Sequence, residues 1–264
     1  MKDQYLDINK ASWNKRTEIH FDSSFYDNES FLKGRNSLNE IELNILGDLN
    51  GKKVLHLQCH FGQDTLSLER LGAEVTGVDL SDVAIEKANV LASRLDSKAR
   101  FICCDVYGLK EVLDEKFDVV FTSYGTIGWL PDINKWASVV SHFLKPKGQF
   151  VFAEFHPVVW MFNDDFSKVE YRYFNDEAIV EIQGSYTDGT EDLCTKNVSW
   201  NHGLGEVINA LIGVGIQILD LKEYDYSPYD CFSGTQEMEP GKFIIEKMGR
   251  NMPMVYSIFG QKKP

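Results

Sequence analysis

The residues with the clearest chemical potential lie between positions 54 and 81, VLHLQCHFGQDTLSLERLGAEVTGVDLS. The pattern predicts a buried strand, a turn, a helix and a second strand ending at Asp79, 17 positions after Gly62. The helix start offers backbone N–H groups without partners, and a carboxylate at the next strand tip can accept bonds from both hydroxyls of a ribose. Asp79 could instead be only a surface acid before a helix. The preceding strand and turn favour a site for a nucleoside-type ligand.

The turn itself, residues 58–63, contains a single glycine, Gly62. Dinucleotide sites use three glycines so that a pyrophosphate can approach the backbone closely. The turn therefore disfavours a pyrophosphate, although an NAD-type oxidoreductase stays as an alternative reading of the same layout.

Other reactive side chains follow later predicted strands, where the carboxyl ends of a parallel sheet would gather them. The groups are Ser123 and Tyr124, then Glu154 and His156, and finally Trp200, Asn201 and His202. His156 precedes a proline and is therefore expected to be extended; it could be a base, a substrate ligand or a structural hydrogen-bond partner. His56 lies within a strand and is expected to be a core histidine.

Short apolar strands alternate with amphipathic helices in most of the chain, which predicts βαβ units and a mostly parallel sheet. The predicted strands are residues 53–59, 74–79, 99–103, 117–123, 148–154, 216–226 and 254–261. The predicted helices are residues 5–21, 37–49, 64–71, 82–95, 131–144 and 204–214. Ser81 is expected to cap the helix from residue 82.

The alternating pattern breaks after Phe155. Residues 157–200 contain two stretches of strand character, 169–174 and 179–186, and a turn signal at Asp188 and Gly189. We expect an antiparallel β insertion here and an irregular loop over residues 227–242. Trp160, Phe162 and Phe166 would be either its core or a hydrophobic wall for substrate.

The composition of the 264 residues is that of a globular protein, with 43% hydrophobic and 25% charged side chains. The net charge of −13 disfavours a nucleic-acid partner. The sequence shows neither an apolar run long enough to span a bilayer nor a secretory signal, so we expect a cytoplasmic protein. The five cysteines are irregularly spaced, which favours reduced thiols and no metal site.

Several of these segments together resemble the class I S-adenosylmethionine (SAM)-dependent methyltransferases. GVDLS at 77–81, FDVVFTSYG at 117–125, LKPKGQFVFAE at 144–154 and the terminal VYSIFGQKK match family segments. The family's first motif is acid-x-Gly-x-Gly-x-Gly. His56, Gln58, His60 and Gly62 occupy its marked positions, so three of the four depart from it. The resemblance covers about residues 37–155 and 203–262, and the HLQCHFGQDT version is similar to bacterial methyltransferase-like proteins.

The resemblance implies an α/β, Rossmann-like, doubly wound sheet of seven strands with the last strand antiparallel, N-terminal helices and the β insertion. It also implies S-adenosyl-L-methionine as cofactor, with Asp79 on the ribose and Asp105 on the adenine amino group. The full predicted cofactor set is Gln58, Cys59, His60, Gly62, Gln63, Asp79, Leu80, Ser81, Asp105, Val106, Ser123, Tyr124 and Trp13. His60 could instead only stack on neighbours, and the face formed by Trp13, Arg16 and His20 could be a lid or a simple docking surface.

The predicted activity is methyl transfer to a small-molecule acceptor, with Tyr124, Glu154, His156 and His202 as candidate catalytic groups. A non-catalytic SAM-binding protein is a further alternative, because the first motif is altered. The predicted organisation is an N-terminal segment and possible lid (1–50), a SAM-binding core (51–156), a substrate-covering insertion (157–202) and the rest of the core (203–264).

Overall fold

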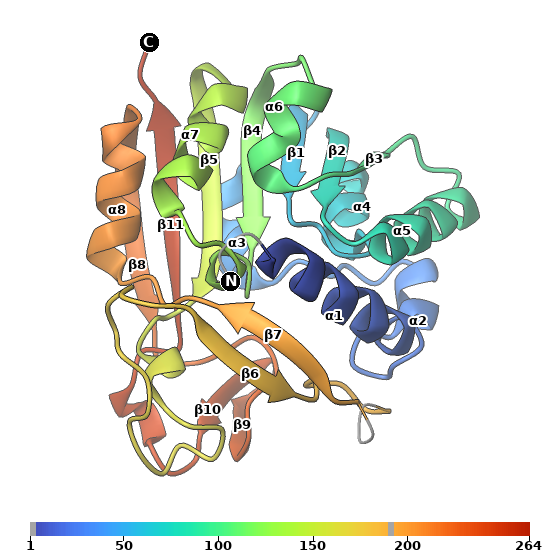
Figure 1. Ribbon diagram of the computed structural model, residues 1–264. Coiled ribbons are helices and arrows are strands. Elements are labelled where there is room, and N and C mark those ends of the chain that lie inside the picture. Colours follow the sequence, from blue (N-terminus) through green and yellow to red (C-terminus); the bar gives the residue numbers. More distant parts are fainter. Residues whose placement is uncertain (1–3, 190–192) are drawn as a thin grey trace.

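A seven-stranded sheet forms the centre of the computed structural model, which describes residues 4–189 and 193–264 (Figure 1). Its strand order is β3 (Arg100–Cys103), β2 (Glu74–Asp79), β1 (Lys53–Leu57), β4 (Phe117–Ser123), β5 (Leu144–Phe155), β11 (Val255–Lys262) and β8 (Ile216–Tyr224). β1 to β5 pair in parallel, whereas β11 is antiparallel to both of its neighbours. The predicted Rossmann-like sheet with an antiparallel last strand is confirmed.

Helices cover both faces of this sheet because successive strand residues point to opposite sides. Leu55 and Val120 face one core, whereas Val54 and Phe121 face the other. The first core is covered by α6 (Leu109–Val112), α7 (Ile133–Phe143) and α8 (Leu204–Gly213), and the second by α3 (Glu40–Leu46) and α4 (Gln63–Arg70). The helix α5 (Asp82–Arg94) contacts β2, β3 and α4, and Ser81 caps it as predicted.

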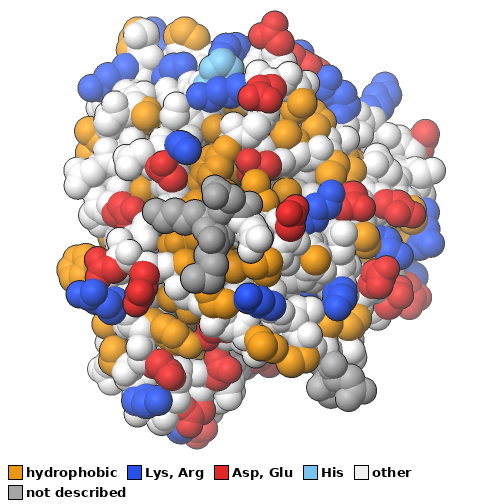
Figure 2. All heavy atoms as spheres, in the orientation of Figure 1, with side chains coloured by type: hydrophobic (Ala, Val, Ile, Leu, Met, Phe, Trp, Pro, Cys, Tyr) orange, Lys and Arg blue, Asp and Glu red, His pale blue; other side chains and the backbone are white. Residues whose placement is uncertain are grey.

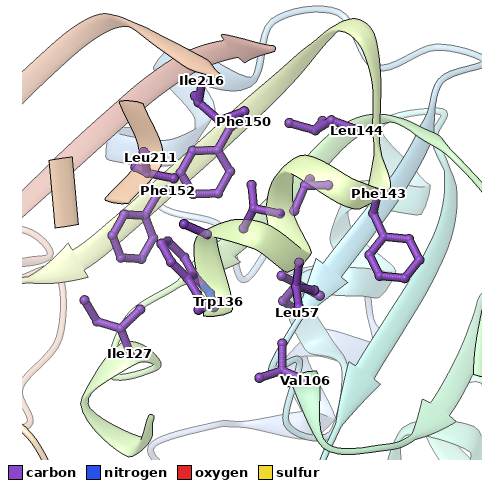
Figure 3. Packing of buried hydrophobic residues seen from close by; sticks show 14 of the residues in the cluster. Leu57, Val106, Ile127, Trp136, Phe143, Leu144, Phe150, Phe152, Leu211 and Ile216 are labelled. Atoms are coloured by element: carbon purple, nitrogen blue, oxygen red, sulfur yellow. The ribbon is translucent and has the colours of Figure 1, made fainter. Parts of the chain in front are cut away.

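The larger core shows how the helices are held on the sheet. Trp136 of α7 lies against Phe150 and Phe152 of β5, at ring-centroid distances of 5.7 and 5.4 Å (Figure 3). All three side chains are fully buried, and burial of each stabilises the fold by about 1.5–3 kcal/mol. This packing fixes the strand that carries Glu154 at its end.

The helix α1 (Tyr5–His20) lies across the carboxyl ends of β1 and β4 and beside the hairpin of β6 (Ile179–Gln183) and β7 (Thr195–Ser199) (Figure 1). The Asn9 amide exchanges two hydrogen bonds with the backbone of Val198, at 2.8 and 2.9 Å. Ser12 bonds Thr195 and Asn197 at 2.8 and 2.6 Å. α1 is therefore fastened to the hairpin by buried polar contacts.

Two sequence-based expectations for the irregular regions are wrong. Residues 169–174 form no strand, and only Val169 makes an isolated bridge, to Phe162. Residues 227–242 are not wholly irregular, since β9 (Thr235–Glu239) pairs with β10 (Lys242–Ile245). β9 is mostly exposed and has no buried face to impose an apolar alternation, so backbone pairing forms it without a clear sequence signal. The short helix α2 (Asn28–Leu32) was not predicted either.

The surface carries charges of both signs. On the face in Figure 2, Lys and Arg side chains are scattered among Asp and Glu over most of the area. In the described part of the chain, no helix has the length and hydropathy needed to cross a membrane.

Candidate functional site

A cavity of about 760 Å³ lies at the carboxyl ends of the parallel strands. Open α/β sheets bind ligands at this edge because helix N-termini and strand-end loops converge there. The cavity is lined by the core, by α1 and by the β6–β7 hairpin, so parts of the chain far apart in sequence share one site.

The turn after β1 keeps a glycine-type backbone although two of its three motif positions are not glycine. Gln58, His60 and Gly62 have φ values of 56°, 50° and 81°, all in the left-handed region. Each non-glycine residue there costs about 1–2 kcal/mol. The turn therefore has left-handed backbone at all three positions where the first motif has glycine. The side chains of Gln58 and His60 make contacts outside the turn.

Gln58 reaches from this turn to the loop after β4. Its Nε2 donates to the Thr126 carbonyl at 2.8 Å, while its Oε1 is buried and has no protein partner. An unpaired buried acceptor beside a cavity is expected to find its donor in a ligand or in water.

Asp79 lies at the tip of β2 and lines the cavity. Its carboxylate accepts hydrogen bonds from the backbone N–H of His60 at 2.8 Å and of Ser81 at 2.9 Å. Burial raises the pKa of Asp79 to about 6, and the backbone donors partly oppose this shift. The two bonds leave each carboxylate oxygen with acceptor capacity for a ligand.

The histidines near the turn are neutral. Burial lowers the pKa of His56 and of His20 to about 3, and burial together with His20 lowers that of His60 well below its ordinary value. The His60 ring packs at 5.4 Å from Trp13 and 5.3 Å from Tyr26, and it also lines the cavity. His56 lies under the turn, with Nδ1 bonded to Thr65 at 2.8 Å.

The structure brings most of the predicted cofactor-binding residues together at the cavity wall. Those that line it are Trp13, Gln58, Cys59, His60, Gly62, Gln63, Asp79, Leu80, Asp105, Val106, Ser123 and Tyr124. Ser81 is absent from this wall because its hydroxyl caps α5 and bonds Asn14 at 2.6 Å.

The candidate catalytic side chains occupy different environments. Glu154 is buried and accepts hydrogen bonds from the backbone N–H groups of Gly125, Thr126 and Ile127, so it holds the loop after β4. His156 bonds Glu223 at 2.9 Å and does not line the cavity. His202 lines it, but both ring nitrogens have partners, in Leu130 and Glu206.

Tyr124 lines the cavity and leads to a carboxyl group that sequence reasoning missed. Its hydroxyl donates to Oε2 of Glu42 at 2.7 Å. Glu42 is fully buried, and burial, followed by the nearby Asp64 charge, raises its pKa to about 7. The sequence signal that could have identified Glu42 is the capping box of Asn39 and Glu42, because it fixes the orientation of this glutamate.

Aromatic side chains form the wall of the cavity away from Asp79. Phe232 has ring-centroid distances of 5.1 Å to Phe155, 5.6 Å to Trp160 and 6.0 Å to Phe166. These side chains, with Phe162, line the cavity. Of the residues expected as either core or wall, Phe162 and Phe166 have both roles, whereas Trp160 is exposed and belongs to the wall alone. Among the described residues, no three His, Cys, Asp or Glu side chains are arranged to hold a metal ion.

The parallel sheet, the left-handed turn and the acid at the tip of β2 define a nucleoside-binding α/β domain of the methyltransferase type. Residues 54–148 match the family model described as a methyltransferase domain. Residues 54–148 thus form a methyltransferase domain, similar to that of the class I SAM-dependent enzymes.

Known proteins agree with this classification. The ubiquinone biosynthesis O-methyltransferase of Alkalilimnicola ehrlichii is 26% identical over 160 residues, which cover 58% of this chain and 64% of that protein. The chain thus spans less than two thirds of that relative's length. An S-adenosylmethionine-dependent methyltransferase structure from Mesorhizobium loti shares the fold with a TM-score of 0.57 and 20% identity, covering 88% and 100% of the two chains. The geranyl diphosphate C-methyltransferase of Streptomyces coelicolor has a TM-score of 0.61 and 15% identity, covering 98% and 97%.

Proposed function

We propose that this protein transfers a methyl group from SAM to a small-molecule acceptor bound in the same cavity. The observation that carries the proposal is the continuity of one 760 Å³ space from Asp79 and Asp105 to the aromatic wall around Phe232. Pockets of about 300–1,000 Å³ hold drug-sized ligands, so this volume suits a cofactor and a modest acceptor together.

The residues present fit the cofactor. Asp79 has free acceptor capacity for the ribose hydroxyls, and Asp105 lines the neighbouring wall for the adenine. The unpaired Oε1 of Gln58 suits the amino group of the methionine part, and the exposed guanidinium of Arg35 suits its carboxylate. Because Gln58 and His60 leave the cavity open, their departure from glycine does not block this placement.

SAM supplies an electrophilic methyl group on a positively charged sulfonium. The protein must therefore orient the acceptor, exclude water and avoid placing positive charge at the sulfonium. The neutral His60 meets the last condition, because a protonated imidazole on the cavity wall at the turn would repel the cofactor. Trp13 and the β6–β7 hairpin form part of the cavity wall.

We assign the removal of an acceptor proton to the pair of Tyr124 and Glu42. An acceptor hydroxyl that bonds the Tyr124 oxygen can pass its proton to it while Tyr124 passes its own proton to ionised Glu42. With its pKa raised to about 7, Glu42 is suited to accept that proton near neutral pH. The O-methyltransferase relative supports an oxygen acceptor.

Two alternative functions, an NAD-type oxidoreductase and a non-catalytic SAM-binding protein, are less well supported. An NAD-type oxidoreductase needs room for a pyrophosphate at the turn, where Gln58 and His60 carry side chains, and the family match favours methyl transfer. A non-catalytic SAM-binding protein would not need a second, aromatic half of the cavity.

Calorimetric titration with S-adenosylhomocysteine tests the cofactor site. Asp79→Asn is expected to weaken binding about 10–100-fold, because each hydrogen bond to a charged group contributes about 1.5–3 kcal/mol. The matched control is Asp114→Asn, which changes an exposed acid outside the cavity wall and should bind like the wild type. Absence of heat and of any thermal shift with millimolar S-adenosylhomocysteine would refute the proposal.

A further inference from the structure

Arg16 of α1 is a buried cation without an acidic partner among the described residues. Its side chain lines the cavity, and only 5% of the residue surface is exposed. It forms no ion pair with any carboxylate in residues 4–189 and 193–264. Within the described part of the chain, its one hydrogen bond runs from a terminal nitrogen to the Gly184 carbonyl at 3.0 Å, and its Nε has no acceptor.

The surroundings of Arg16 compensate its charge incompletely. The guanidinium lies over the rings of Trp13 and Trp129, at 5.4 and 5.7 Å from their centroids. These contacts and one carbonyl leave most of its five N–H groups unused. Glu181, which also lines the cavity, accepts instead from Tyr171. A charge held away from water in this way is costly unless an anion pairs with it.

Arg16 lies where α1 meets the hairpin, next to Trp13 of the predicted cofactor set. It points from α1 towards Gly184, directly after β6, and so belongs to the wall formed by the hairpin. Arg35 is the other cationic side chain of the cavity, and it bonds Gln63 at the start of α4, beside the turn. Of the two guanidinium groups, Arg35 thus bonds a residue beside the cofactor turn, and Arg16 bonds the hairpin segment.

We infer that Arg16 recognises a carboxylate on the methyl acceptor, whose ring or other flat apolar body packs on the aromatic wall of Phe155, Trp160 and Phe232. This inference rests on the proposed methyltransferase function and names its substrate class. A planar guanidinium pairs with a carboxylate through two parallel hydrogen bonds, which fixes orientation as well as adding affinity.

The test uses the full-length protein saturated with S-adenosylhomocysteine and four aromatic acids, each paired with its neutral amide. The acids are benzoate, phenylacetate, 4-hydroxybenzoate and cinnamate. Titration of each pair is expected to show at least one acid binding at least tenfold tighter than its amide. Arg16→Met should abolish that preference and leave the affinity for S-adenosylhomocysteine within about twofold, whereas Arg16→Lys should retain part of it.

The exposed Arg94→Met is the matched control and should behave as the wild type. The inference is overturned if no acid outbinds its amide, or if Arg16→Met weakens S-adenosylhomocysteine tenfold without affecting the acids, because the anion is then the cofactor's own carboxylate. Should Arg16→Met not fold, the acid-to-amide ratios of the wild type and Arg16→Lys decide. Failure of the proposed function looks different, since the wild type would then not bind S-adenosylhomocysteine.

Discussion

Glu42 is a single side chain that links the proposed proton transfer to the stability of the protein. It is buried beside Tyr124, and its pKa is raised from 4.5 to about 7. The folded state therefore binds more protons than the unfolded chain between these two pH values. A group of this kind stabilises the fold below pH 4.5, and its contribution is lost as the pH rises through 7.

Through Glu42, the wild type should lose about 3 kcal/mol of unfolding free energy between pH 4.5 and 8. We predict that Glu42→Gln lacks this loss. Urea unfolding of the ligand-free protein at several pH values measures this difference. The exposed Glu40→Gln on the same helix is the control and should keep the wild-type profile. Parallel profiles for Glu42→Gln and wild type would mean that Glu42 ionises as it does in the unfolded chain.

The residues that the sequence could identify are those tied to a local pattern. Asp79 follows a strand, a turn and a helix at a spacing that only a few architectures share, and it lines the cavity as expected. Glu42 and Arg16 acquire their roles through burial against residues far along the chain, such as Tyr124 and Gly184. No local pattern encodes such contacts, so they became visible only in the structure.

At the scale of elements, the joint between β1 and α4 depends on Gly62. Its φ is +81°, and a Cβ there would lie 2.6 Å from the Phe101 ring and 3.2 Å from Ala88. Because both neighbours belong to packed elements, neither can move without disturbing the core.

We therefore expect Gly62→Ala to lower the free energy of unfolding by about 2–4 kcal/mol, through strain and overpacking. Denaturant unfolding of the ligand-free protein is the measurement. Gly205→Ala in α8 is the matched control: its Cβ would meet nothing within 4 Å, and alanine favours a helix by up to about 1 kcal/mol. Equal stabilities of the two variants would argue that the turn adapts freely.

The elements best predicted from sequence are those with a buried face. β2 and β4 have the predicted bounds, and α1, α5 and α8 agree with prediction to within one or two residues. The β9–β10 hairpin was not predicted, because the exposed strand β9 carries no periodic apolar signal, whereas residues 169–174 carry an alternating signal and form no strand. Sequence therefore predicted the framework of the site better than its cover.

At the scale of the whole molecule, three parts of the chain meet around one cavity. The α/β core supplies the turn and Asp79, α1 supplies Trp13 and Arg16, and the hairpin supplies Gly184 and its neighbours. α1 and the hairpin are bonded to one another through Asn9 and Ser12. We call α1 and the β6–β7 hairpin the cover of the cavity. A ligand in the cavity should accordingly stabilise this cover as a unit, in addition to the core residues that it contacts.

Hydrogen exchange measured with and without saturating S-adenosylhomocysteine tests this coupling. We predict slower amide exchange in α1 and in the described strands β6 and β7, as well as in residues 58–63, because opening of the cover must now proceed against the ligand-binding free energy. At a ligand concentration of about 100 Kd this adds up to about 2.7 kcal/mol, or roughly 100-fold in exchange rate for amides that exchange only through that opening. Asn9→Ala removes both bonds to Val198 and should reduce the protection of the hairpin more than that of the turn. Protection confined to the turn and to the ends of β2 and β3 would instead mean that α1 and the hairpin are docked on the core without enclosing the ligand.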